Sequence, residues 1–185
     1  MRARRLAADG CGIGFCSALT LCGRRDASTS VEPTDEEDSV ATTQNQAVDV
    51  LNSFLRGEIS AVETYRQALE KVQKPQVQTQ LQSCLQSHAQ RVDALTAQIR
   101  TLGGSPATSS GVWGSFAKAV EAGAKTFGES AAVAALEEGE DHGRNDYRRD
   151  IEKLDADTRQ FVQTNLIPEQ QRTHDAMSAL KKSLS

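Results

Sequence analysis

Apolar side chains recur every three or four positions from residue 42 onward, which is the period of amphipathic α-helices. The pattern falls into four long segments, and it predicts helices over residues 43–74, 75–102, 130–154 and 157–182. Pro75 suits the first turn of the second helix, and Gly103 and Gly104 suit its end. Asp157 is the expected N-cap of the fourth helix, and Pro168 is expected to kink or break it.

The connections between these segments differ in length. Short turns join the first helix to the second and the third to the fourth, so each pair is expected to form an antiparallel hairpin. Residues 105–129 make a longer connection, in which Trp113, Phe116 and Val120 have the spacing of a short amphipathic helix. Two hairpins joined by one long crossover are typical of an all-α four-helix bundle of the ferritin-like type.

The first and third predicted helices contain an internal repeat. Residues 56–72 read RGEISAVETYRQALEKV and residues 138–154 read EGEDHGRNDYRRDIEKL, which align without a gap. Six positions are identical: Gly57/Gly139, Glu58/Glu140, Tyr65/Tyr147, Arg66/Arg148, Glu70/Glu152 and Lys71/Lys153. The chain is therefore interpreted as a duplicated hairpin with a Gly-Glu pair in the middle of each copy.

One titratable residue interrupts the apolar face of each predicted helix: Glu58, His88, Glu140 and His174. Counted from the two hairpin turns, these residues lie within one helical turn of a common level. Two buried carboxylates are costly unless they are protonated, paired or bound to a cation. Two Glu and two neutral His form a ligand set for Fe, Mn or Zn, so a metal site is predicted. A metal-free hydrogen-bonded network remains the alternative.

Four further residues are expected close to this layer. Tyr65 and Tyr147 lie two turns beyond their Glu and are interpreted as core residues that donate to a carboxylate. His142 is a candidate to support a ligand. Cys84 precedes His88 by one turn and is interpreted as a buried small residue rather than a redox thiol. No Ser/His/Asp arrangement or phosphate-binding loop occurs, so no catalytic residue is assigned.

The sequence LNSFLRGEISAVETY, with its G-E-x-x-A-x-x-x-Y pattern, resembles the first helix of rubrerythrins and other ferritin-like proteins. The crossover and the Glu-Gly-Glu of residues 138–140 are most similar to an uncharacterised bacterial ferritin-like family, a domain of unknown function. The resemblance covers residues 44–182 and implies terminal Glu and His ligands at the four positions above. Leu85 and Gln171 stand where the bridging carboxylates of a di-iron site are found.

The lack of bridging carboxylates decides the order of the functional hypotheses. The first is a ferritin-like protein that binds a single metal ion, with a stress-related role. The second is a metal-free helical bundle that acts in protein interaction or as a homo-oligomer. A di-iron oxidase or peroxidase is the least favoured, because the bridging carboxylates are absent.

Composition limits the partners and the location. The chain has 185 residues and a formal net charge of −4, which argues against a general nucleic-acid-binding protein. It has no continuous apolar stretch of about 20 residues, so no membrane span is predicted. The bundle, residues 41–185, is expected to be cytoplasmic.

Residues 1–40 lack a helical period and contain three of the four cysteines. Their spacing does not match a zinc site, and glycines interrupt the run that a signal peptide would need. We expect this segment to be disordered. A further hypothesis is that translation starts at Val40, which the intact mass of the protein from its native host would test.

Overall fold

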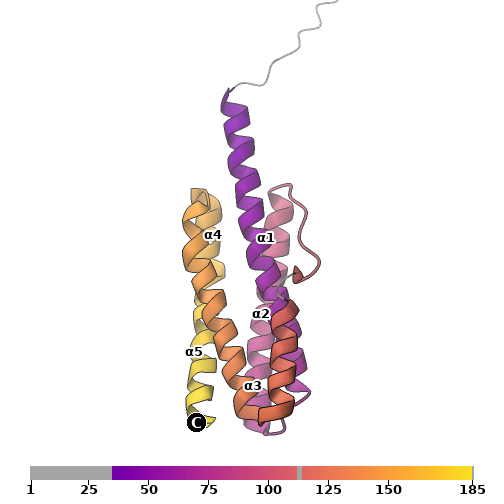
Figure 1. Cartoon of the computed structure of the whole chain (residues 1–185). Helices are drawn as coiled ribbons and strands as arrows, with labels where there is room; N and C mark the ends of the chain where they lie inside the picture. Colours follow the sequence, from indigo (N-terminus) through magenta and orange to yellow (C-terminus); the bar gives the residue numbers. More distant parts are fainter. Residues whose placement is uncertain (1–34, 112–113, 185) are drawn as a thin grey trace, which may run out of the picture. The chain divides into compact units, whose positions relative to one another are not determined.

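The computed structural model describes the backbone of residues 35–111 and 114–184, and the side chains of residues 42–111 and 128–184. The elements in chain order are α1 (Asp35–Leu69), α2 (Pro75–Thr101), α3 (Gly114–Asp150), the 3₁₀-helix η2 (Ile151–Lys153), α4 (Ala156–Asn165) and α5 (Ile167–Leu184) (Figure 1). The described residues contain no strand, which confirms the all-α class. Residues 1–34 of the segment predicted to be disordered, and the cysteines in it, lie outside the described residues.

The long helices pack as a ring in which each has two neighbours. Helix α1 contacts α2 and α3, and α5 contacts the same two helices. The helices run side by side along the bundle (Figure 1). The predicted helical bundle is therefore observed. Helix α1 runs over Asp35–Leu69 rather than the predicted 43–74, so residues 35–40, which were expected to be disordered, belong to it.

The crossover between the hairpins runs from one end of the bundle to the other. At its start, the Leu102 carbonyl accepts a hydrogen bond from the Gln44 side chain at 2.7 Å. At its end, the Glu129 carboxylate accepts hydrogen bonds from the backbone N–H groups of Gln73 and Lys74. Residues 44 and 73 lie about 40 Å apart along a helix axis, at 1.5 Å per residue.

Helix α3 contains both the predicted crossover helix and the predicted third helix of the bundle. Gly128, with φ 78° and ψ −167°, separates the two parts. A positive φ is costly for residues with a Cβ atom, so glycine is favoured at this kink. The side chains of Trp113, Phe116 and Val120 lie outside the described residues.

The fourth predicted helix consists of two helices. Helix α4 ends at Asn165 and α5 begins at Ile167, so the break lies beside Pro168 as expected. The N-cap is Asp155 rather than the predicted Asp157, because the Asp155 carboxylate accepts the Thr158 N–H at 2.9 Å. Asp157 lies instead in the first turn, where a negative charge still favours the helix dipole.

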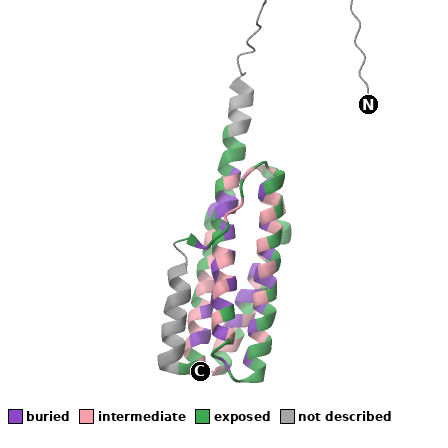
Figure 2. Ribbon diagram, turned by 90° about the vertical axis from the view of Figure 1, so that its right-hand side faces the viewer, coloured by how far each residue is buried: buried purple, intermediate pink, exposed green. Residues whose placement is uncertain are grey.

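Two apolar clusters fill the bundle, and α1, α2 and α3 contribute buried residues to both. Figure 2 shows the buried positions along the helices. The first contains Leu51, Leu55, Leu95, Ile99, Tyr147, Val162 and Leu166. The second contains Tyr65, Val72, Leu81, Val133, Leu136 and Met177. Along each helix, a buried polar stretch separates the residues of one cluster from those of the other. This polar layer contains the candidate site.

Candidate functional site

The polar layer is built from all four long helices of the ring. Its six buried members are Glu58 of α1, His88 and Arg91 of α2, Glu140 of α3, and Gln170 and Thr173 of α5. Each is at most 4% exposed, so the charges among them are screened little by solvent. We call these six residues the polar network.

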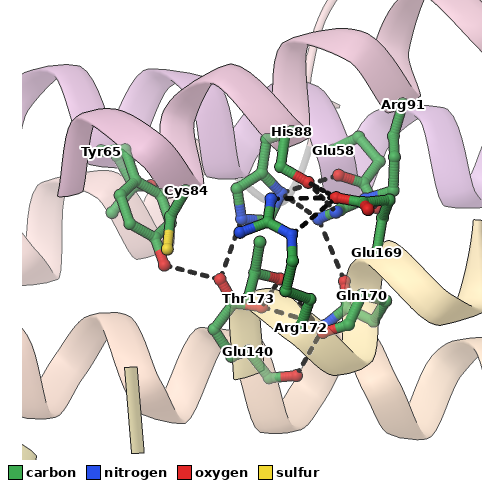
Figure 3. A network of polar contacts seen from close by, with 12 residues as sticks. Glu58, Tyr65, Cys84, His88, Arg91, Glu140, Glu169, Gln170, Arg172 and Thr173 are labelled. Atoms are coloured by element: carbon green, nitrogen blue, oxygen red, sulfur yellow. Dashed lines mark hydrogen bonds and ion pairs between the residues drawn. The ribbon is translucent and has the colours of Figure 1, made fainter. Parts of the chain in front are cut away.

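His88 joins the two glutamates (Figure 3). Its Nδ1 lies 2.7 Å from Glu58 Oε2, and its Nε2 lies 2.9 Å from Glu140 Oε1. Carboxylates only accept hydrogen bonds, so a proton on each ring nitrogen satisfies both contacts. Burial and the charge of Arg91 lower the His88 pKa, but the two carboxylates outweigh them and the pKa is raised.

Arg91 supplies the second cation of the network. Its Nε donates to Glu58 Oε1 at 2.8 Å, and its Nη2 donates to Gln170 Oε1 at 3.2 Å. The Nη2 atom also lies 2.6 Å from His88 Nδ1, so Arg91 and Glu58 approach the same ring nitrogen. Arg91 is 1% exposed, and nothing in the pattern of apolar positions predicted its role.

The charges of the network balance. Burial by itself would raise the Glu58 pKa, but Arg91 and His88 reverse this effect and lower it to about 2. The Glu140 pKa is also lowered, because His88 and hydrogen bonds from Tyr65 and Thr173 outweigh burial. Two carboxylates therefore face one imidazolium and one guanidinium, and the network is neutral overall.

The two tyrosines of the repeat cross between its copies. Tyr65 donates to Glu140 Oε1 at 2.6 Å, and Tyr147 donates to Glu58 Oε1 at 2.9 Å. Each tyrosine thus donates a hydrogen bond to the glutamate of the other copy. The spacing of the residues within one copy does not indicate this exchange. The chain Tyr65–Glu140–His88–Glu58–Tyr147 forms one continuous line of hydrogen bonds.

The repeat also relates α2 to α5, which the sequence analysis missed. His88 bonds Glu58 over 30 positions, and Gln170 bonds Glu140 over 30 positions. Ser87 bonds Glu169 over 82 positions, the offset that also separates Glu58 from Glu140. Continuing the gapless alignment into the second helix of each hairpin would have paired His88 with Gln170.

His174 lies outside the polar network, unlike the other three predicted ligands. Its Nε2 is 3.0 Å from Asp141 and its Nδ1 is 3.2 Å from Asp175. Its neighbour Thr173 instead donates to Glu140 Oε2 at 2.8 Å. Successive residues of a helix point about 100° apart, so the next position along α5 faces a different side.

The remaining two candidates have different environments. Cys84 is fully buried, and burial followed by the charge of Glu140 raises its thiol pKa, so the thiolate is disfavoured. His142 is exposed and lies at the rim of a cavity between α1 and α3.

The donor set as it stands does not fit a metal ion. Both His88 nitrogens donate to carboxylates, so neither offers a lone pair. Glu58 is already paired with the Arg91 guanidinium. Among the described residues, no three His, Cys, Asp or Glu side chains are arranged to hold a metal.

Comparisons with known proteins give one match. The family model described as "Domain of unknown function (DUF2383)" matches residues 46–153, more than half of the chain. No curated protein and no solved structure matches significantly. None of the helices in the described ranges is long and apolar enough to span a membrane.

Proposed function

Since the chain belongs to the DUF2383 family, an all-helical domain of unknown function, we propose that it is a ferritin-like bundle that needs no metal ion. It acts through contacts with other proteins, including further copies of itself. The observation that carries the proposal is the Arg91 guanidinium against Glu58, at 2.8 Å.

Three features support the ferritin-like arrangement. The chain forms two helical hairpins, α1 with α2 and α3 with the α4–α5 pair. The crossover between them spans the bundle from Leu102 to Glu129. The polar network lies at mid-length, between two apolar clusters, where ferritin-like proteins place their ligands.

The charge balance supports the metal-free state. Buried carboxylates need a cation, and a metal ion is one way to supply it. In this bundle, Arg91 and His88 supply both positive charges from α2. The network thereby links α1, α2, α3 and α5 without an external ion, and all its charged groups are already paired. This leaves no unpaired charged group within the polar network.

A single bound metal is the second candidate, because His88 lies within hydrogen-bonding distance of both Glu58 and Glu140. Binding of Fe, Mn or Zn would require a protonated His88 to lose one ring proton and the Arg91 side chain to leave Glu58. A di-iron oxidase is the weakest candidate, because Leu85 and Ile167, three residues before His88 and its counterpart Gln170, are not carboxylates.

Metal analysis and thermal unfolding together test the proposal. Protein purified without a histidine tag, from cells supplied with iron, manganese and zinc, should contain well under one metal ion per chain. Its melting temperature should be the same with and without a chelator. Stoichiometric metal that disappears in the Glu58→Ala, Glu140→Ala double variant would establish the second candidate instead.

The Arg91→Met variant provides a matched control. It keeps much of the side-chain length but removes the cation, so a charge is left buried without its partner. We expect this variant to lower the free energy of unfolding by about 3 kcal/mol, both with and without the chelator. Light scattering coupled to size-exclusion chromatography tests the association, for which a mass above that of one chain is expected.

A further inference from the structure

A cavity of about 70 Å³ lies between α1 and α3 and reaches the polar network. This volume is several times the roughly 10–15 Å³ that one water molecule needs. Glu58, His88 and Glu140 lie at its inner side, and Ser53 and His142 are exposed at its rim. The cavity is therefore accessible and is larger than a packing defect.

The lining of the cavity follows the internal duplication. Seven pairs, each separated by the 82-residue offset of the repeat, contribute to it: Phe54 with Leu136, Gly57 with Gly139, Glu58 with Glu140, Ser60 with His142, Ala61 with Gly143, Thr64 with Asp146, and Tyr65 with Tyr147. His88 and Gln170 form an eighth pair on α2 and α5. Three of the six identities between the two copies are thus residues around one cavity.

Gly57 keeps this space open. It lies in the middle of α1 without a positive φ, where glycine costs roughly 0.5–1 kcal/mol relative to alanine. A Cβ atom there would meet nothing within 4 Å, so close helix packing does not explain the glycine. By contrast, a Cβ on Gly104 would lie 2.6 Å from Val48. The glycine therefore leaves open space on the cavity side of α1.

The electrostatics of the lining select against charged molecules. All four carboxylate oxygens of Glu58 and Glu140 already have a protein donor, and Asp146, the third carboxylate of the lining, pairs with Arg149 at 2.8 Å. The buried side-chain atoms without a partner, among the described residues, belong to Gln67, Arg144 and Arg159 and not to the polar network. An ion entering the cavity would lose its hydration without meeting an unpaired opposite charge.

The walls select for an apolar body. Phe54, Leu136 and Ala61 line the cavity together with the glycines. The Thr64 hydroxyl is engaged with the Ser60 carbonyl at 2.7 Å. A ligand would therefore be recognised through apolar contacts with these walls, with its polar group directed to the rim of the cavity.

We propose that the cavity between α1 and α3 is a binding site for a small neutral molecule with an apolar body of a few carbon atoms. This proposal does not depend on whether the polar network binds a metal ion. The ligand would contact the outer side of the polar network, whose charged groups are already paired within the protein.

Three probes with the same three-carbon chain test the charge selectivity: 1-propanol, propionate and 1-propylammonium. Backbone amide NMR of the full chain, followed at Gly57, Gly139 and Gly143, should show saturable shifts with 1-propanol. The two ions should bind at least tenfold more weakly. Comparable binding of either ion, or the lack of any saturable shift with 1-propanol, would overturn the proposal.

Two variants locate the site. Gly57→Leu places a side chain in the cavity and should abolish the 1-propanol shifts, whereas Gln90→Leu adds the same side chain at an exposed position of α2 and should leave them unchanged. Gly57→Ala adds one methyl group and should weaken binding by a smaller factor, which keeps the test valid if the leucine variant does not fold. Unchanged affinity in the folded Gly57 variants would contradict the assignment.

Discussion

Individual side chains in the polar network have their properties set by their neighbours on other helices. His88 is protonated because carboxylates from α1 and α3 lie on both sides of its ring. Arg91 is tolerated at 1% exposure because Glu58, Ser87 and Gln170 accept its hydrogen bonds. Removing one member therefore leaves its partner buried and uncompensated.

The pKa values predict how stability depends on pH. The Glu58 pKa falls from 4.5 to about 2 on folding, so its contribution is present above pH 4.5 and is lost as the pH falls toward 2. The shift corresponds to at most about 3 kcal/mol. The His88 pKa rises from 6.5, so its contribution is present below pH 6.5 and is lost as the pH rises through the folded-state value. Urea unfolding followed from pH 2 into the alkaline range should thus show that the free energy of unfolding falls below pH 4.5 and again above pH 6.5.

The His88→Gln variant separates the contributions of Glu58 and His88 to the pH dependence of stability. It should be less stable than the wild type at pH 6 and should lose the decline in stability that begins above pH 6.5. It should keep the acid decline, since Arg91 still pairs with Glu58. An alkaline decline of the same size in this variant would show that another group causes it.

The helices are delimited by local signals in the sequence. Pro75 begins α2, the break before Ile167 lies beside Pro168, and Asp155 caps α4. Glycines have two distinct roles. Gly103 and Gly128 have positive φ values of 73° and 78°, whereas Gly57 lies in a regular helix beside the cavity.

These roles predict opposite effects of the same substitution. Gly57→Ala should raise the stability by roughly 0.5–1 kcal/mol, because alanine favours the helix and meets no neighbour. Gly128→Ala should lower it by about 1 kcal/mol, since alanine is strained at positive φ. Thermal unfolding should show melting temperatures that differ in opposite directions from the wild type by roughly 2–4 °C each. A stabilising Gly128→Ala would mean that the kink is not needed.

The whole molecule is a duplicated hairpin whose two copies have diverged where the network needs asymmetry. Glu and Tyr are kept in both copies, and they exchange hydrogen bonds across the bundle. The cations come only from the first copy, as His88 and Arg91, whereas the second copy has Gln170 and Thr173 at the same offsets. Two copies of the cation pair would leave two surplus positive charges buried.

This symmetry predicts that the network can be moved to the other hairpin. His88→Gln with Arg91→Thr should cost about 3 kcal/mol or more, because two carboxylates lose their cations. Adding Gln170→His and Thr173→Arg should restore at least half of this loss, since α5 lies opposite the same glutamates. Chemical denaturation of the two variants measures the difference. A quadruple variant no more stable than the double variant would count against equivalence of the copies.

The sequence by itself determined the helices, the two hairpins, the long crossover and the level of the polar layer. These follow from local periodicity, from turn residues and from the rise of 1.5 Å per residue. The sequence also placed Glu58, His88 and Glu140 together, because all three interrupt an apolar face.

Only the tertiary structure decided the partners within that layer. A side chain points about 100° away from its neighbour along a helix, so the rotation of α5 against α3 directs Thr173 to Glu140 and His174 to Asp141. Arg91 could not be assigned from the sequence, because arginine is usually exposed and its burial depends on acceptors from three helices. The pattern fixed where charge is buried, and the packing of the helices fixed what neutralises it.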